Sequence, residues 1–106
     1  MVVEFAALGG FDFAIIDAEH GINDLETMEN MVRAAEAFGI VPIARVSTNE
    51  VQLILRYLDA GAIGVQIPQI QTATEAQQVV GAVKYRPMGK RGLAAVRAAR
   101  YGMQLR

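Results

Sequence analysis

Three runs of nearly uninterrupted apolar residues divide the chain, and each is followed by a segment whose apolar positions have helical spacing. The runs cover residues 11–17, 40–46 and 62–67. Continuous apolar runs, rather than strict alternation, are typical of strands that are buried on both faces, as in a parallel sheet. The sequence therefore predicts three parallel strands with helices between them.

Start and stop signals delimit the helical segments. From Leu25 onward, apolar residues recur every three or four positions; Asn23 and Glu26 have capping-box spacing, and Gly39 is the stop. The same signals predict two further helices, one begun by Ser47 with Glu50 and one by Thr72 with Glu75. Residues 3–8 are expected to form the end of another helix.

Alternating strands and helices predict an α/β fold with parallel strands and right-handed crossovers. An open doubly wound sheet and part of a (β/α)8 barrel both fit this order. Three parallel strands alone would leave two unpaired edges and too little helical cover. We therefore expect residues 1–106 to form one incomplete domain that ends in a basic loop, residues 84–106.

Composition narrows the class of protein. The chain has 106 residues, is 53% hydrophobic and contains no Cys, which excludes a disulfide scaffold and Cys-rich zinc sites and argues against disorder. No apolar run reaches the roughly 18 residues of a membrane span. The first residues lack the basic region of a secretory signal, so we expect a cytoplasmic protein without a membrane partner.

Charge is divided unevenly along the chain. Residues 1–83 hold 3 basic and 11 acidic side chains, whereas residues 84–106 hold 7 basic and none that is acidic. The segment Gly89-Lys90-Arg91-Gly92 lacks the spacing of a phosphate-binding loop, and the net charge of −1 does not favour a nucleic-acid partner. We expect the basic segment to pack against the acidic part of the chain instead.

A candidate site follows the first strand. Asp17, Glu19 and His20, the only histidine, lie where parallel α/β folds place their working residues, at the carboxyl ends of strands. A neutral imidazole there can act as a general base, with Asp17 or Glu19 fixing its tautomer. The alternatives are a surface histidine beside a loop-capping aspartate, or a metal bound by all three, although three such close neighbours rarely converge on one ion.

Two further candidates end the other strands. Arg45 lies within an apolar run, where a guanidinium needs an anionic partner. That partner is either a substrate carboxylate, held bidentately, or a structural ion pair with Asp17, Asp12 or Asp59. Gln66 ends the third strand on the same edge, where it either lines a pocket or bonds to a loop.

These residues also carry a family resemblance. Residues 11–21 resemble the FDxxxIDxEHG signature of the HpcH/HpaI family of metal-dependent class II pyruvate aldolases, and residues 41–46 resemble that family's next strand with its substrate arginine. Residues 58–68 are similar to an LDxGAxGxxxP stretch. Residues 85–92 and 97–102 are similar to a YPPxGxRG…RAxxYG loop.

The resemblance implies a (β/α)8 barrel, usually hexameric, that reversibly cleaves 4-hydroxy-2-oxo acids into pyruvate and an aldehyde. Within the class, the substrate is a general hydroxy-oxo acid such as 4-hydroxy-2-oxoheptanedioate or a sugar acid such as 2-dehydro-3-deoxy-glucarate or -rhamnonate. A divalent ion, Mg²⁺, Mn²⁺ or Co²⁺, stabilises the enolate. His20 is implied as the base with Asp17, and Arg45 as the oxo-acid ligand; the supporting or subunit-contact residues would be Asp59, Glu19 and Gln66.

One part of the family pattern has no match. The Glu and Asp that bind the metal in the family lie on later strands, so we expect the ligands to lie C-terminal to Arg106 and the isolated chain to be inactive or poorly folded. The other readings are a non-catalytic α/β module that binds an anion and a structural fragment that assembles with a partner chain.

Overall fold

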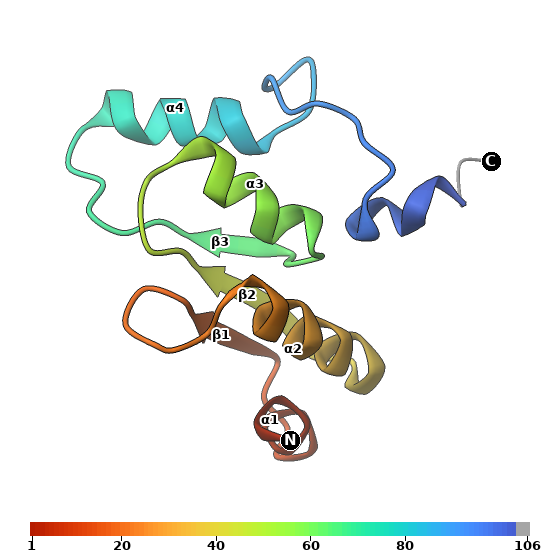
Figure 1. Cartoon of the computed structure of the whole chain (residues 1–106). Coiled ribbons are helices and arrows are strands. Elements are labelled where there is room, and N and C mark those ends of the chain that lie inside the picture. Colours follow the sequence, from red (N-terminus) through yellow and green to blue (C-terminus); the bar gives the residue numbers. More distant parts are fainter. Residues whose placement is uncertain (104–106) are drawn as a thin grey trace.

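The three strands lie side by side in the order in which they occur along the chain (Figure 1). β1 (Phe13–Asp17) pairs with β2 (Val41–Arg45), and β2 pairs with β3 (Gly64–Gln66), in parallel in both cases. The structure is a computed structural model and describes residues 1–103. Arg106, counted above in the basic segment, lies outside the described residues.

Helices alternate with the strands, as the sequence predicts. They are α1 (Val2–Leu8), α2 (Leu25–Phe38), α3 (Val51–Asp59) and α4 (Ala73–Val83), followed by a 3₁₀ segment, η1 (Arg97–Gly102). This order confirms the α/β class. Each strand is shorter than its apolar run because ladder pairing stops where the neighbouring strand ends, while flanking residues such as Ile40 and Val46 still pack in the core.

The predicted capping signals have different outcomes. The capping box of Thr72 and Glu75 at α4 is confirmed, and Gly39 ends α2 in the left-handed conformation with φ of 75°. The box predicted at Asn23 is wrong, because Asp24 is the N-cap of α2 and accepts a hydrogen bond from the backbone N–H of Thr27 at 2.8 Å. The signal predicted at the start of α3 is also wrong: Glu50 precedes that helix without a side-chain cap.

One face of the sheet is covered by α2 and α3 (Figure 1). Its core joins alternate strand residues to the apolar stripes of the two helices, with the main members Ile16, Met28, Val32, Ala44, Val46 and Ile54. In contrast, α4 has no buried residue and lies against α3 rather than against the sheet.

The opposite face of the sheet is open to solvent. Its side chains alternate with those of the core, and Phe13, Ile15 and Val41 are all exposed. Parallel sheets normally have both faces covered. The open face is therefore the one that a complete barrel would enclose in its interior.

The basic segment packs against acidic residues, as expected. Arg91 forms an ion pair with Asp59 at 2.7 Å, and Arg97 pairs with Glu36 at 2.5 Å while also donating to the carbonyl of Ala60. These contacts hold the basic segment against the C-terminal ends of α2 and α3. Within the described residues, no helix is long and apolar enough to cross a membrane.

Candidate active site

Three of the predicted site residues form a row across the carboxyl ends of the strands. The register pairs Asp17 with Arg45, and Arg45 with Gln66. Directly paired residues of neighbouring strands point to the same face of a sheet. The row therefore ends the open face, beyond the apolar side chains of Phe13 and Ile15.

The loop after β1 folds back on the end of its own strand. Oδ1 of Asp17 accepts hydrogen bonds from the backbone N–H groups of Glu19 at 2.9 Å and His20 at 3.2 Å. The side-chain amide of Asn23 donates to the carbonyl of Asp17 at 2.9 Å. A Cβ atom at Gly21 would lie only 2.5 Å from that same carbonyl oxygen, so the turn needs a glycine there.

These bonds favour the ionised form of Asp17. The pKa of its carboxyl is held below the usual value, first by the N–H groups of Glu19 and His20 and to a smaller extent by the charge of Arg45. Asp17 therefore carries a negative charge near neutral pH. Its visible role is to fix the backbone of the loop that bears His20.

Glu19 is the principal partner of Arg45. Its Oε2 lies 2.7 Å from both Nε and Nη2 of the guanidinium, whereas Oδ1 of Asp17 is 3.6 Å from Nε. The Glu19 side chain is 13% exposed and that of Arg45 is 30% exposed. The sequence offered Asp17, Asp12 and Asp59 as structural partners of Arg45. Of these, only Asp17 lies near the guanidinium, and Glu19 is the closer partner.

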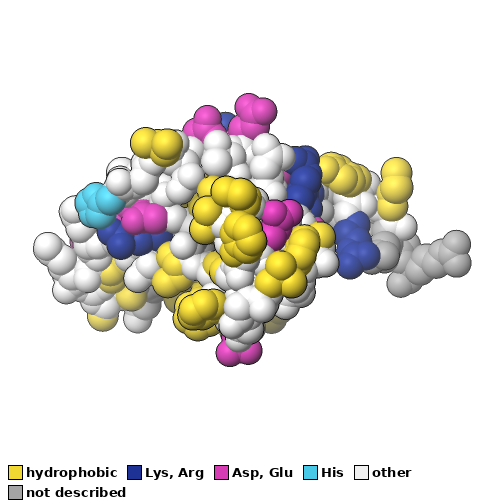
Figure 2. Space-filling view, turned by 90° about the horizontal axis from the view of Figure 1, so that it is seen from below, with side chains coloured by type: hydrophobic (Ala, Val, Ile, Leu, Met, Phe, Trp, Pro, Cys, Tyr) yellow, Lys and Arg dark blue, Asp and Glu magenta, His cyan; other side chains and the backbone are white. Residues whose placement is uncertain are grey.

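His20 stands at one end of this cluster and reaches solvent. Figure 2 shows the histidine beside acidic and basic side chains, at the edge of a face that also carries hydrophobic side chains. Its ring is 71% exposed, and Nε2 lies 3.6 Å from Oε1 of Glu19. The carboxylate that faces the imidazole is thus Glu19, and Asp17 reaches His20 only through the backbone N–H.

Two predicted site residues differ in their placement. Gln66 is exposed next to Arg45 and belongs to the cluster. Asp59 ends α3, just before β3 begins, and therefore lies at the opposite edge of the sheet, paired with Arg91. The structure does not bring Asp59 to the residues that surround His20.

Sequence reasoning missed the roles of Gly21 and Asn23 in the loop after β1, whereas Gln69 was among the residues after the third strand that could line a pocket. Gln69 has a positive φ of 57°, which is uncommon for a residue other than glycine, in the turn after β3. It borders a cavity of about 240 Å³ at the carboxyl ends of β2 and β3, lined by Ser47, Thr48, Asn49, Pro68, Gln69 and Glu75. The sequence signal for this turn was the pair Pro68-Gln69 directly after an apolar run.

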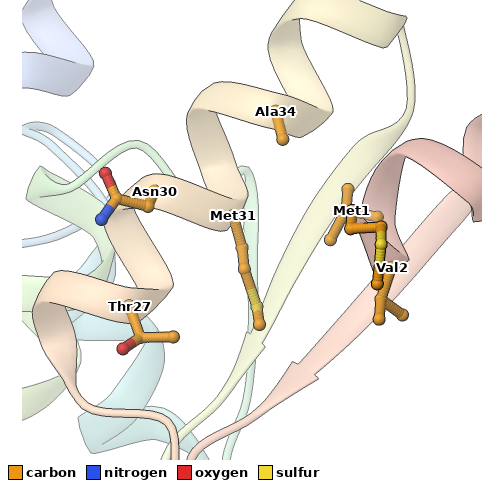
Figure 3. Close-up of a pocket in the computed structure, with 7 residues that line it drawn as sticks. Met1, Val2, Thr27, Asn30, Met31 and Ala34 are labelled. Carbon is orange, nitrogen blue, oxygen red and sulfur yellow. The ribbon is translucent and has the colours of Figure 1, made fainter.

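A separate cavity lies between α1 and α2, away from the cluster around Arg45. It measures about 350 Å³ and is shown in Figure 3, with the side chains of Met1, the N-cap of α1, and of Val2 in α1 facing Met31 and Ala34 of α2. No acidic, basic or histidine side chain of the described residues lines it. It offers packing space rather than groups for chemistry.

Comparison with known proteins gives a consistent result. Residues 1–102 match the family model described as HpcH/HpaI aldolase/citrate lyase. The chain is 43% identical over 99 residues to a 2-dehydro-3,6-dideoxy-6-sulfogluconate aldolase from Pseudomonas putida, covering 91% of this chain and 39% of that protein. It is 38% identical over 103 residues to a 2-keto-3-deoxy-L-rhamnonate aldolase from Salmonella gallinarum, covering 95% and 39%.

A solved structure agrees with the sequence matches. The chain superposes on an HpcH/HpaI aldolase/citrate lyase family protein from Burkholderia cenocepacia with a TM-score of 0.90 and 36% identity, covering 98% of this chain and 43% of that one. The predicted fold, about three parallel βα units of a (β/α)8 barrel, is thereby confirmed. The chain spans about two fifths of the length of the curated relatives it matches.

Proposed function

The chain belongs to the HpcH/HpaI aldolase/citrate lyase family, and on that premise we propose that it forms the oxo-acid-binding and proton-transferring part of an aldolase active site. The reaction is the reversible cleavage of a 4-hydroxy-2-oxo acid into pyruvate and an aldehyde. One observation carries the proposal: Arg45, at the carboxyl edge of the sheet, is held beside the only histidine by the carboxylate of Glu19.

Arg45 binds the oxo-acid end of the substrate. A guanidinium presents five N–H donors in a planar fork that matches a carboxylate. Glu19 occupies the edge formed by Nε and Nη2. The end formed by Nη1 and the second hydrogen of Nη2 is left to hold a second carboxylate bidentately.

His20 moves the proton. It takes the proton of the substrate's 4-hydroxyl group, the C3–C4 bond breaks, and C4 becomes the carbonyl carbon of the aldehyde. The bonding electron pair passes into the enolate of pyruvate, which regains a proton at C3 and leaves His20 neutral again. An exposed imidazole next to the Arg45 site is accessible to such a substrate.

The described residues do not fit the divalent ion, Mg²⁺, Mn²⁺ or Co²⁺, that the family resemblance implies. Across residues 1–103, no three His, Asp or Glu side chains come together as possible ligands. Glu19 is engaged by Arg45, and Oδ1 of Asp17 already accepts two backbone N–H groups. The proposed roles of Arg45 and His20 include no metal, and a ligand pair C-terminal to Arg106 stays a prediction.

We further propose a 2-dehydro-3-deoxy sugar acid as the substrate class. Both curated relatives are named for acids of this kind, one a sulfogluconate and one a rhamnonate derivative. Gln66, exposed beside Arg45, is a polar side chain that can hydrogen-bond to a substrate hydroxyl. The extent of the domain, residues 1–106, stays a prediction. Assembly into a homo-oligomer, a hexamer, also stays a prediction.

Ligand binding tests the proposal on this chain directly. Pyruvate, acetate and inorganic phosphate are titrated into ¹⁵N-labelled protein, and shifts are followed at the amides of residues 17–20 and 45. We expect pyruvate to bind here, Arg45→Ala to abolish binding, and the surface variant Arg33→Ala to leave it unchanged. If phosphate bound as tightly as pyruvate, the site would not distinguish an oxo acid from another anion. That result would favour a simple anion-binding module.

A catalytic assay separates the two parts of the proposal. Pyruvate release from 2-keto-3-deoxy-L-rhamnonate is measured with and without Mn²⁺, beside His20→Ala. We expect no release from the isolated chain, because the described residues hold no metal site. Release that requires both Mn²⁺ and His20 would support the aldolase function and contradict the predicted position of the metal ligands.

A further inference from the structure

Glu19 lies between the two groups that the proposed reaction uses. One carboxylate oxygen, Oε2, contacts the Arg45 guanidinium at 2.7 Å, and the other, Oε1, faces Nε2 of His20 at 3.6 Å. Glu19 is also the least exposed of the three side chains, at 13%. A partly buried carboxylate with both oxygens directed at site residues has a more specific role than a surface charge.

The contact with Arg45 is made on one particular edge of the guanidinium. Nε and Nη2 lie on the same side of the planar group, and both meet the same oxygen of Glu19. Such a side-on contact fixes the plane of the guanidinium and its rotation about the last bonds of the side chain. It also leaves the end of the fork unobstructed by Glu19.

Asp17 does not orient the guanidinium, although it is the register partner of Arg45. Its Oδ1 accepts the N–H groups of Glu19 and His20, and it lies 3.6 Å from Nε, beyond hydrogen-bond distance. The two carboxylates thus divide the task. Asp17 fixes the backbone of the loop through its hydrogen bonds, and this backbone places the Glu19 side chain against Arg45.

We propose that Glu19 is a positioning residue: it holds Arg45 side-on so that the free end of the guanidinium is aimed at the carboxylate of a 2-oxo acid, and it keeps His20 on the same side of the site. The substrate part of this statement rests on the proposed function. The positioning part rests on the contacts alone, and it assigns to Glu19 the contact with the histidine that the motif had assigned to Asp17.

The test follows Arg45 itself. The Nε–H resonance of Arg45 is assigned by its loss in Arg45→Lys, and its exchange with water is compared in wild type, Glu19→Gln and Glu19→Asp. Glu29→Gln is the matched control, because Glu29 pairs with Arg33 on the surface of α2. We expect faster exchange in Glu19→Gln, a smaller change in Glu19→Asp, and none in the control.

The same samples are then titrated with pyruvate. We expect Glu19→Gln to weaken pyruvate binding about tenfold, the scale of one hydrogen bond to a charged group, although pyruvate does not touch Glu19. Unchanged Nε–H exchange in both Glu19 variants would overturn the positioning role. Tighter pyruvate binding in Glu19→Gln would also overturn it, because Glu19 would then compete with the ligand for Arg45.

The two proposals fail in different ways. If wild-type protein shows no response to pyruvate, the proposed function fails, while the Nε–H exchange still decides whether Glu19 positions Arg45. If Glu19→Gln does not fold, as judged from its amide spectrum, Glu19→Asp carries the comparison, since it keeps the charge and shortens the reach. Slow exchange in a folded Glu19→Asp, equal to wild type, would then count against positioning.

Discussion

Arg45 and Asp17 are register partners on adjacent parallel strands, and Nε of Arg45 lies 3.6 Å from Oδ1 of Asp17. This proximity is set by the sheet ladder rather than by a flexible loop. A shift of one residue in register would turn one of the two side chains toward the apolar core. The site is therefore built on the strands of the sheet, and only Glu19 and His20 are added from a loop.

Replacing Arg45 by Lys is expected to weaken ligand binding and leave the fold intact. An ammonium group is a point charge and cannot contact Glu19 side-on while holding a carboxylate with a second edge. Pyruvate binding should weaken at least about tenfold. Chemical-shift titration measures this, with Arg33→Lys as the control; affinity equal to wild type would show that the geometry of the fork is unimportant.

Acid is expected to loosen the loop after β1. The pKa of Asp17 is lowered because its ionised form accepts two backbone N–H bonds, so those bonds favour the folded loop above the ordinary pKa of an aspartate. They are lost as the pH falls through the lowered pKa, which lies below the ordinary value for an aspartate.

The amide shifts of Glu19 and His20, recorded from pH 7 downward, measure this transition. In Asp17→Asn the step should disappear, because an amide does not titrate. A transition of the same size in that variant would assign it to another group. Asp24, whose pKa is also lowered through the N–H of Thr27, provides an internal comparison at the α2 cap.

Adding one methyl group at Gly21 should displace His20. The Cβ of alanine would lie 2.5 Å from the carbonyl oxygen of Asp17 and 3.2 Å from Nδ2 of Asn23, so the turn must open. We expect Gly21→Ala to shift the amides of residues 17–23 and to cost about 1–3 kcal/mol of unfolding free energy, typical of overpacking. Urea denaturation measures the cost, and Gly92→Ala, with open space around it, should have little effect.

The elements themselves could be predicted because their signals are local. Apolar runs, helical spacing and the Thr72–Glu75 box each fall within a few residues, and all gave the correct element. The choice between Asn23 and Asp24 as N-cap failed, because both residue types cap helices and only Asn23 has the Glu of a capping box three positions on, Glu26. Only the folded loop shows that the side-chain amide of Asn23 instead donates a hydrogen bond to the carbonyl of Asp17.

The site could be predicted as a set of residues but not as a set of contacts. Strand ends identified Asp17, Arg45 and Gln66, since carboxyl ends of parallel strands share one edge. The contact of Glu19 with Arg45 joins residues 26 positions apart, and no spacing rule reports it. Asp59 lies at the opposite edge, because a helix that starts at the carboxyl edge ends at the other one, and its role as a subunit contact stays a prediction.

The loop after α4 leads to a prediction about stability. Alanine substitutions at two glycines, Gly89 and Gly81, should change the free energy of unfolding in opposite directions. The N–H groups of Lys90 and Arg91 donate to the carbonyls of Gly81 and Lys84 at 2.7 and 3.0 Å, which satisfies the free carbonyls at the end of α4. Gly89 lies against the same carbonyls. A Cβ there would be 2.7 Å from the Gly81 oxygen and closer still to that of Lys84.

Gly89→Ala should therefore lower the free energy of unfolding by about 1–3 kcal/mol, because the loop must leave the helix end or distort. Gly81→Ala should raise it by about 0.5–1 kcal/mol, since Gly81 lies within α4 with open space at its Cβ and alanine favours the helix. Urea denaturation followed by circular dichroism compares the two. A stabilising Gly89→Ala would mean that the loop does not rest on α4 in solution, and the Arg91–Asp59 pair would then lose its support.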